Sequence, residues 1–262
     1  MLIISERSLA EAYEKALIRL YKEGTRFRTQ YDRPDDPLSL DCTLNLTILE
    51  PESDPMIHQA FPGGIEDLKE YVMELKGFKD HWVKNMDDKE DTRWEYTYHG
   101  RLVAYGSWKE RNKDAKLPGS KEVGFKINQI EHVIRKLVEQ PYTRQAQMIT
   151  WMPNIDLEVF DPPCLQSLWY RILEDDDHVQ WLNCNIRFRS NDAWGASFMN
   201  MFGFIQFNKE ILAVEIEKRS GKKTNLGRMN WQADSYHIYG KDIEIARSML
   251  FDRLEEMPFE NR

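Results

Sequence analysis

The sequence lacks a long apolar run: no window approaches the roughly 18 uncharged apolar residues that a membrane-spanning helix needs. The N-terminal stretch MLIISERSLAEAYEK meets charged residues after four apolar ones, so no signal peptide is expected. Cysteine is scarce, with only Cys42, Cys164 and Cys184, and no two of them form a CxxC pair. This odd number and wide spacing favour neither a disulfide framework nor a metal site such as zinc. We therefore expect a cytoplasmic protein with no membrane partner.

Internal repeats, low-complexity tracts and linkers are missing as well, which favours a single domain over residues 1–262. The hydrophobic fraction of 41% suffices for a buried core. A net charge of −8 repels polyanions, so no nucleic acid partner is expected, whereas a local basic pocket can still bind a small anion. The eight tryptophans are interpreted mostly as core and interface residues, with base stacking as the alternative.

Apolar residues at helical spacing predict several helices. Ser8 and Glu11 have the spacing of a capping box, and an apolar stripe from Leu9 to Leu20 follows, with Gly24 at its end. Further helices are predicted over about 65–76, over 126–139, from Phe198 towards Lys218, and after Tyr239.

Strands are predicted mainly in the second half of the chain. Over residues 182–190, apolar side chains alternate with polar ones, and the polar face carries Arg187 and Arg189. Such a face must meet solvent, a partner or a ligand. Further strand-like segments are 92–106, 155–159, 164–172 and 235–239, while 85–92 and 109–120 are charged surface loops. Together these elements predict a mixed α+β fold.

Cys164 is the first candidate for chemistry. It follows Asp161-Pro162-Pro163, and two consecutive prolines fix the backbone that presents the next side chain. A thiol has an ordinary pKa of about 8.5 and needs a positive neighbour to react near neutral pH. Arg189 can supply that charge and can also bind phosphate with two hydrogen bonds. The alternatives are a buried structural cysteine and a solvated turn at 189–192.

Three further polar side chains stand out. Asn200 lies in an apolar helix, where its amide must be hydrogen-bonded, either to the edge of a pyrimidine or to neighbouring backbone. His237 and Tyr239 alternate on a predicted strand and so project from one face, as two ligands of a sugar hydroxyl would. A core histidine beside a tyrosine would give the same pattern.

The order of these motifs carries more information than any one of them. The sequence has PPC at 162–164, R-S-x-D at 189–192, asparagine at 200 and H-x-Y at 237–239. This order resembles the thymidylate synthase superfamily, specifically over Thr143 to Tyr239 and more vaguely in the N-terminal half. The resemblance implies a thymidylate synthase-like domain with a large mixed β-sheet flanked by helices, one sheet face lying at a homodimer interface.

In that family a thiolate adds to C6 of the pyrimidine, C5 becomes nucleophilic, and 5,10-methylenetetrahydrofolate supplies the carbon, so Cys164 is implied to be the nucleophile. Glu70, in the helix before Lys76-Gly77, matches the glutamate that orders water and relays protons around O4 of the base, although alone it would be an ordinary exposed charge. The other implied roles are phosphate binding for Arg189 and Ser190, pterin binding for Asp192, base reading for Asn200, and binding of the sugar 3′-hydroxyl for His237 and Tyr239.

Two more phosphate-binding arginines are implied from elsewhere in the chain. Arg144 matches the first of two arginines that the family donates across its dimer interface, which implies a homodimer with shared sites. Arg28 and Arg33 are both candidates for the N-terminal phosphate arginine.

The sequence also departs from the family pattern. Gln145 replaces the second interface arginine, Leu165 replaces the histidine after the nucleophile, and Ala-Ser-Phe-Met stands at 196–199 in place of Gly-Leu-Pro-Phe. The chain ends in the charged EEMPFENR, where thymidylate synthases carry an apolar tail that closes over the folate. Similar departures occur in a branch with archaeal synthases and nucleotide hydroxymethylases.

The function predicted from this resemblance is methylation of dUMP to dTMP. Hydroxymethylation of dUMP, dCMP or CMP is the alternative, because water instead of hydride can attack the same intermediate when the site does not exclude water. Asn200 favours uracil, since its amide can donate to O4 and accept from N3–H, although a bridging water can invert this preference. A third interpretation is a catalytically silent nucleotide-binding protein.

Overall fold

The computed structural model describes residues 1–83, 90–106, 126–157, 159 and 161–252. The chain divides into two compact units. Unit 1 comprises Met1–Leu68, Arg187–Ile205 and Gly227–Arg262, and unit 2 comprises Lys69–Ile186 and Gln206–Leu226. Each unit gathers segments that are far apart in the sequence. A single domain over the whole chain stays a prediction.

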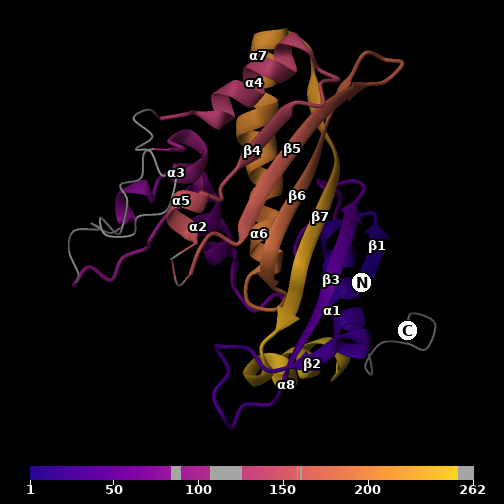
Figure 1. Ribbon diagram of the computed structural model, residues 1–262. Coiled ribbons are helices and arrows are strands. Elements are labelled where there is room, and N and C mark those ends of the chain that lie inside the picture. The colour runs from indigo at the N-terminus through magenta and orange to yellow at the C-terminus, as the bar shows by residue number, and fades with distance from the viewer. Residues whose placement is uncertain (84–89, 107–125, 158, 160, 253–262) are drawn as a thin grey trace. The chain divides into compact units, whose positions relative to one another are not determined.

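The strands of the described residues form one mixed sheet with the order β1-β3-β7-β6-β5-β4, and β2 pairs with β3 (Figure 1). β1 runs parallel to β3, whereas the β2–β3, β3–β7 and β4–β5 pairs are antiparallel. The predicted α+β class with a large mixed sheet and flanking helices is thereby confirmed. The strands are β1 (Leu2–Glu6), β2 (Thr25–Phe27), β3 (Ser39–Ile48), β4 (Ala146–Ile149), β5 (Leu165–Glu174), β6 (Gln180–Asp192) and β7 (Thr224–Ile238).

In unit 1, helix α1 (Leu9–Glu23) packs on β1 and β3. The predicted capping box is present: the Glu11 backbone N–H donates to the Ser8 hydroxyl, and the Glu11 carboxylate accepts from the Ser8 backbone N–H at 2.8 Å. Aromatic rings contribute to the core: Tyr13 lies edge-on to Phe198 of α6 (Ser197–Phe207), with the ring centres 5.0 Å apart. After β7 the chain ends its described part in η3 (Gly240–Asp242), α8 (Ile243–Arg247) and η4 (Ser248–Asp252).

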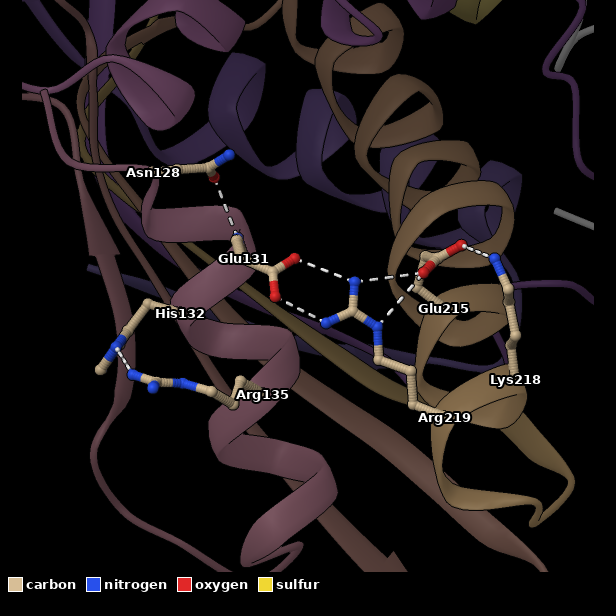
Figure 2. Close-up of polar contacts among 7 residues, drawn as sticks. All are labelled: Asn128, Glu131, His132, Arg135, Glu215, Lys218 and Arg219. Atoms are coloured by element: carbon tan, nitrogen blue, oxygen red, sulfur yellow. Dashed lines mark hydrogen bonds and ion pairs between the residues drawn. The ribbon is translucent and has the colours of Figure 1, made fainter.

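Unit 2 holds most of the other helices. They are α2 (Ile65–Leu75), which begins in unit 1, then η1 (Asp80–Trp82), α3 (Tyr98–Val103), α4 (Gln129–Glu139), α5 (Pro153–Asp156), η2 (Asn208–Ala213) and α7 (Val214–Ser220). An ion-pair network joins α4 to α7 on the surface (Figure 2). Arg219 binds the Glu131 carboxylate with two hydrogen bonds, at 2.7 and 2.9 Å, and also contacts Glu215 at 3.3 Å.

The predicted strand over 92–106 is wrong, because residues 98–103 form helix α3. Thr97 caps this helix by accepting the Gly100 backbone N–H at 3.0 Å. Cap and tertiary contacts here override the strand preference of aromatic residues. The predicted strand over 155–159 is also wrong: Pro153 begins the helical turn α5, and the Asp156 carboxylate accepts the Met152 backbone N–H at 2.6 Å. The predicted loop at 109–120 lies outside the described residues, as does most of the one at 85–92.

One other prediction needs a change of length, that of the strand after α7. Gly221 ends α7 in the left-handed conformation, with φ of +71°, as a helix-terminating glycine should. The following strand was expected to be short, near residues 235–239, but β7 begins at Thr224 and continues for 15 residues. Its pairing with β3, for example of Met229 with Ile48, extends the strand into a segment whose sequence is typical of a turn. In the described part of the chain, no helix is both long enough and apolar enough to span a membrane.

Candidate functional site

Cys164 lies in unit 2, in the bend that directly precedes β5, and its side chain is half-buried. The backbone on both sides of the thiol is held. The Pro163 carbonyl accepts a hydrogen bond from the Gln166 side chain at 2.8 Å, and the Leu165 carbonyl accepts one from the Thr150 hydroxyl. The backbone on both sides of Cys164 is therefore held by hydrogen bonds, and this cysteine is less buried than Cys184.

Tyr98 is a neighbour of this thiol that the sequence analysis missed. Its hydroxyl oxygen accepts the Leu165 backbone N–H at 3.4 Å. Burial raises the pKa of the Tyr98 hydroxyl, and the neighbouring Tyr96 and Cys164 raise it further. Tyr98 thus supplies a protonated hydroxyl beside the nucleophile candidate. One feature of the sequence could have indicated this neighbour. Thr97 is a good helix N-cap residue, and a helix that begins after it has Tyr98 in its first turn.

A buried ion pair supports the segment that leads to Cys164. The guanidinium of Arg101 donates to both carboxylate oxygens of Asp156, at 2.9 and 2.8 Å, and to the Thr150 carbonyl at 3.1 Å. Arg101 is 2% exposed and Asp156 is 1% exposed. Because Thr150 also contacts the Leu165 carbonyl, this pair connects α3 and α5 to the residue after the thiol.

Glu70 lies on α2 with its side chain 61% exposed, and its carboxylate pairs with Lys79. One helical turn later, Glu74 is more deeply placed, and burial raises the pKa of its carboxyl to about 7 although Lys79 opposes the shift. The Lys79 ammonium also lies 5.3 Å from the centre of the Trp94 ring. α2 therefore offers a carboxylate paired with Lys79 and, one turn later, a carboxyl whose pKa burial raises to about 7.

Arg144 lies in an exposed position just before β4. Its backbone carbonyl accepts the Trp169 indole N–H at 3.0 Å, which fixes the main chain at this point. Neighbouring Gln145 is exposed too, and its backbone N–H donates to the Thr143 hydroxyl at 3.2 Å. The role of Arg144 across a dimer interface stays a prediction.

In unit 1, Arg189, Ser190 and Asp192 occupy the last part of β6, each half-buried. One carboxylate oxygen of Asp192, Oδ1, accepts the backbone N–H groups of Trp194 and Gly195, at 3.0 and 2.9 Å. A Cβ at Gly195 would lie 2.7 Å from the other oxygen, so glycine is needed for this close approach. The carboxylate is held in one orientation ahead of α6.

His237 and Tyr239 lie at the end of β7, and their rings meet edge-on with centres 4.8 Å apart. The Ala193 backbone N–H donates to the His237 carbonyl at 2.7 Å, which joins the end of β6 to this strand. The Ser235 hydroxyl donates to Asp41 at 2.7 Å and also lies 3.3 Å from His237 Nδ1. Since a hydroxyl has one hydrogen to donate, Nδ1 of His237 is the donor in that contact, and in a neutral imidazole Nε2 is then an acceptor.

The Nε2 atom of His237 is buried and makes no hydrogen bond with the residues that the structure describes. The whole side chain is only 5% exposed. An unpaired buried acceptor is costly, and a ligand hydroxyl would satisfy it.

Asn200 is 7% exposed on α6, and its side-chain oxygen accepts a hydrogen bond from Asn191 at 3.0 Å. Asn191, which the sequence analysis did not single out, accepts in turn from the indole N–H of Trp231 at 3.1 Å. The buried amide is therefore bonded, as predicted, although through another side chain. Neither Asn191 nor Trp231 could be linked to Asn200 from sequence, because they lie on separate strands.

The two N-terminal arginines differ in their surroundings. The Arg28 guanidinium donates to the backbone carbonyls of Arg33 and Asp36, at 3.1 and 2.7 Å, and so ties its own loop together. The Arg33 guanidinium makes no hydrogen bond to a described residue, although the Arg33 backbone N–H donates to Asp36 at 2.8 Å. Arg33 is thus better placed than Arg28 to bind an external anion.

The structure gathers part of the predicted set. Arg189, Ser190, Asp192, Asn200, His237 and Tyr239 all belong to unit 1, at the end of β6, on α6 and at the end of β7. Cys164, Glu70 and Arg144 belong to unit 2, with Cys164 beside Tyr98 and Glu70 beside Lys79. Arg28 and Arg33 lie in the loop after β2, also in unit 1.

The mixed sheet with flanking helices is consistent with the fold of enzymes that transfer one-carbon units to nucleotides, and sequence comparison identifies the family. The profile described as "Thymidylate synthase" matches residues 67–259, well over half of the chain. The protein therefore belongs to the thymidylate synthase family. Membership implies a one-carbon transferase with folate-related chemistry and a pyrimidine nucleotide substrate.

Similar proteins occur in methanogenic archaea, and each bears the name "Putative thymidylate synthase". The protein of Methanocaldococcus jannaschii is 29% identical over 246 residues, which cover 91% of each chain. Those of Methanococcoides burtonii and Methanosarcina mazei are 27% and 26% identical over 248 residues, covering 95% of this chain and 94% of theirs. Such identities place this protein in a divergent branch of the family.

Proposed function

We propose that this protein methylates dUMP at C5 to give dTMP, with Cys164 as the nucleophile. The observation that carries the proposal is the half-buried Cys164 at the start of β5, with hydrogen bonds tying the backbone on both sides, in a chain of this family. Addition of the thiolate to C6 makes C5 nucleophilic, so that C5 can attack a one-carbon donor.

The donor in this proposal is 5,10-methylenetetrahydrofolate, which supplies both the carbon and a hydride when bound. Asp192 fits a pterin ring, because its carboxylate is half-buried, fixed by two backbone N–H groups, and an acceptor for ring N–H donors. Glycine at 195 leaves room beside that carboxylate.

The substrate is recognised in this proposal by side chains of unit 1. Arg189 and Ser190 bind the phosphate, together with Arg33, whose guanidinium is better placed than that of Arg28. The 3′-hydroxyl of the sugar donates to Nε2 of His237, which is buried and poised to accept, and Tyr239 lies against the same ring. Asn200 reads the base, since an amide can donate to O4 of uracil.

Protons are handled by residues of unit 2. Tyr98 holds its proton because its pKa is raised, so its hydroxyl can donate a hydrogen bond to the thiolate or to water next to it. Glu70 relays protons at O4 of the base. Glu74, whose carboxyl has a pKa of about 7, is a second group on α2 that can exchange protons at working pH.

We further propose a homodimer in which Arg144 is donated across the interface to the phosphate of the partner's site. Its exposed position before β4 is compatible with this role. The missing second arginine, Gln145, leaves the contact to one guanidinium.

Hydroxymethylation of a pyrimidine nucleotide is the second candidate. The departures from the family pattern at Gln145, Leu165 and residues 196–199 resemble those of a branch that includes nucleotide hydroxymethylases, and in a site that does not exclude water, water can replace hydride as the attacking group. Mass spectrometry of the product separates the two: a methyl group with dihydrofolate supports methylation, and a hydroxymethyl group without dihydrofolate supports the alternative.

The test of the proposal is product formation from dUMP and 5,10-methylenetetrahydrofolate by the full chain. We expect dTMP and an equal amount of dihydrofolate, and neither product with Cys164→Ser. If the wild type binds dUMP but makes no product with dUMP, dCMP, UMP or CMP, the chain is a silent nucleotide-binding protein. If Cys164→Ser retains turnover, the nucleophile is assigned wrongly.

A further inference from the structure

Residues 28–38, which join β2 to β3 in unit 1, form a loop that is held at several points along its own length. The Arg28 guanidinium donates to the backbone carbonyls of Arg33 and Asp36, at 3.1 and 2.7 Å. The Asp36 carboxylate accepts the Arg33 backbone N–H at 2.8 Å. The two prolines of this loop restrict its backbone as well. A loop restrained in this way has little conformational freedom left to lose when it binds a ligand.

Further contacts join this loop to the end of β7 (Figure 1). The Ser39 hydroxyl donates to Asp32 at 2.9 Å and accepts the Gly240 backbone N–H, also at 2.9 Å. A hydroxyl has one hydrogen, so after donating to Asp32 its oxygen is left to accept from Gly240. The other carboxylate oxygen of Asp32 accepts the Thr29 backbone N–H at 2.6 Å. We call the two hydrogen bonds of the Ser39 hydroxyl the Ser39 link, because they connect the loop to the residue after Tyr239.

Close packing reinforces the Ser39 link. A Cβ at Gly240 would overlap the Pro37 carbonyl oxygen, so only glycine lets the two backbones approach this closely. The Tyr31 ring meets the Tyr239 ring edge-on, with centres 6.2 Å apart. Ser39 itself is fully buried. The loop is therefore packed against the strand end that carries the candidate ligands of the sugar.

We propose that Asp32, Ser39 and Gly240 are positioning residues for the nucleotide phosphate, an inference that rests on the proposed function. They act through Arg33, whose side chain is exposed and whose guanidinium makes no hydrogen bond to a described residue. Because the loop is held before a ligand arrives, less of the binding free energy of Arg33 is lost to ordering the loop. The Ser39 link also fixes the loop relative to Tyr239, so that phosphate and sugar are bound by one preorganised unit.

Ser39→Ala is the primary test, because it removes both hydrogen bonds of the Ser39 link and little volume. We expect the dissociation constant for dUMP, measured by calorimetry on the full chain, to rise about tenfold, the usual size of one charge-assisted hydrogen bond. Deoxyuridine has the same base and sugar but no phosphate, so its dissociation constant, measured by NMR titration, should stay within about a factor of two. Asp32→Asn keeps the side-chain shape but has one accepting oxygen, and should give a smaller loss with the same selectivity.

Further variants separate positioning from a merely structural effect. Arg33→Ala should weaken binding of dUMP but not of deoxyuridine, and adding Ser39→Ala to it should cause no further loss, because the link acts through this guanidinium. Gly240→Ala should weaken dUMP binding as Ser39→Ala does, since the new methyl group displaces the loop from β7. Gly64→Ala is the matched control and should keep both constants, because a Cβ there would lie 3.7 Å from its nearest neighbour, the Asp67 carboxylate.

The outcomes separate this inference from the function on which it rests. In a folded Ser39→Ala variant, an unchanged dUMP constant, or equal losses for dUMP and deoxyuridine, would overturn the inference while dTMP formation stands. Full additivity with Arg33→Ala would overturn it too. If circular dichroism shows that Ser39→Ala does not fold, the same comparison on Asp32→Asn decides.

The wild type gives the remaining distinction. A chain that binds dUMP but makes no product contradicts the methylation proposal and leaves the test of the Ser39 link intact. A chain that binds no pyrimidine nucleotide overturns both.

Discussion

At the scale of single residues, the three cysteines show how surroundings separate a reactive thiol from inert ones. Burial, with the nearby Asp41 carboxylate adding to it, raises the pKa of Cys42 to about 12. Cys184 is buried against the Asn208 amide, whose Nδ2 lies 3.3 Å from the sulfur. Cys164 is half-buried, and hydrogen bonds hold the backbone on both sides of its thiol.

We expect alkylation by iodoacetamide at pH 8 to modify Cys164 first. The thiolate is the reactive form, and at that pH Cys42 remains almost fully protonated while Cys184 is inaccessible. Peptide mass spectrometry over time measures the order, and Cys164→Ser should suppress the early product. Earlier labelling of Cys42 would contradict this assignment.

Tyr98→Phe should lower kcat about tenfold with little change in nucleotide affinity. The substitution removes the hydroxyl that accepts the Leu165 N–H and leaves the ring, and a hydrogen bond of this kind contributes about 1 kcal/mol. Steady-state kinetics with dUMP gives the result. Tyr142→Phe, at a position 76% exposed, is the matched control and should be silent; equal losses in both variants would refute the role.

Glu74 should make stability depend on pH. Its carboxyl has a pKa of about 7 in the folded chain against an ordinary 4.5, so the folded state binds the proton more tightly. The contribution of the Glu74 carboxyl to the free energy of unfolding is therefore fully present below pH 4.5 and is lost as the pH rises to about 7. We compare the free energy of unfolding of Glu74→Gln with that of wild type. Because the side chain is partly exposed, we expect this difference to shift in favour of the variant by only about 1 kcal/mol from pH 5 to pH 8.

Urea unfolding at the two pH values measures this difference. Glu139→Gln, an exposed position on α4, is the control and should show no change with pH. A constant difference between Glu74→Gln and wild type would mean that Glu74 titrates normally in the folded chain.

At the scale of elements, sequence patterns succeeded where one local signal dominated. The capping box of Ser8 and Glu11 located α1, and strict alternation located β6, whose apolar face is buried as predicted. They failed at α3 and α5, where aromatic and alternating residues suggested strands. There the Arg101–Asp156 pair, formed by residues distant in sequence, stabilises two short helices that no periodicity reveals.

In the candidate site, too, the residues that the sequence could indicate differ from those that only the folded chain brings together. Cys164, Arg189, Asn200 and His237 were predicted because the order of their motifs is visible in the sequence itself. Tyr98 and the hydrogen bonds that join Trp231, Asn191 and Asn200 were not predicted, because these contacts form only in the folded chain.

Breaking the Arg101–Asp156 pair should destabilise the protein strongly. Arg101→Met leaves a buried carboxylate without its partner, which typically costs about 3–5 kcal/mol. The double variant Arg101→Met with Asp156→Leu should recover part of that loss, since no buried charge remains. Urea unfolding tests both, with Arg135→Met on the surface of α4 as the control; a loss below 1 kcal/mol in the single variant would contradict the structure.

At the scale of the whole molecule, the chain belongs to the thymidylate synthase family and divides into two compact units. In the proposed enzyme, the negative net charge leaves phosphate recognition to local arginines, for which we propose Arg189, Arg33 and Arg144. If Arg144 is donated across a dimer interface, no single subunit is complete.

Subunit mixing tests that dimer. Arg144→Ala and Cys164→Ser should each be nearly inactive, but a hybrid dimer carries one site with intact Cys164 and a partner's intact Arg144. Random mixing should therefore restore about a quarter of wild-type activity. Absence of recovery, despite exchange of subunits shown by native mass spectrometry, would place Arg144 in its own subunit's site or outside it.

The central claim is a covalent bond between the Cys164 sulfur and C6 of the nucleotide. The most direct measurement is the intact mass of the protein after incubation with 5-fluoro-dUMP and 5,10-methylenetetrahydrofolate, because fluorine at C5 cannot leave as a proton and the adduct accumulates. We expect a mass increase equal to nucleotide plus cofactor, located on Cys164 and lost in Cys164→Ser. A wild-type chain that binds the nucleotide and keeps its unmodified mass would contradict the account.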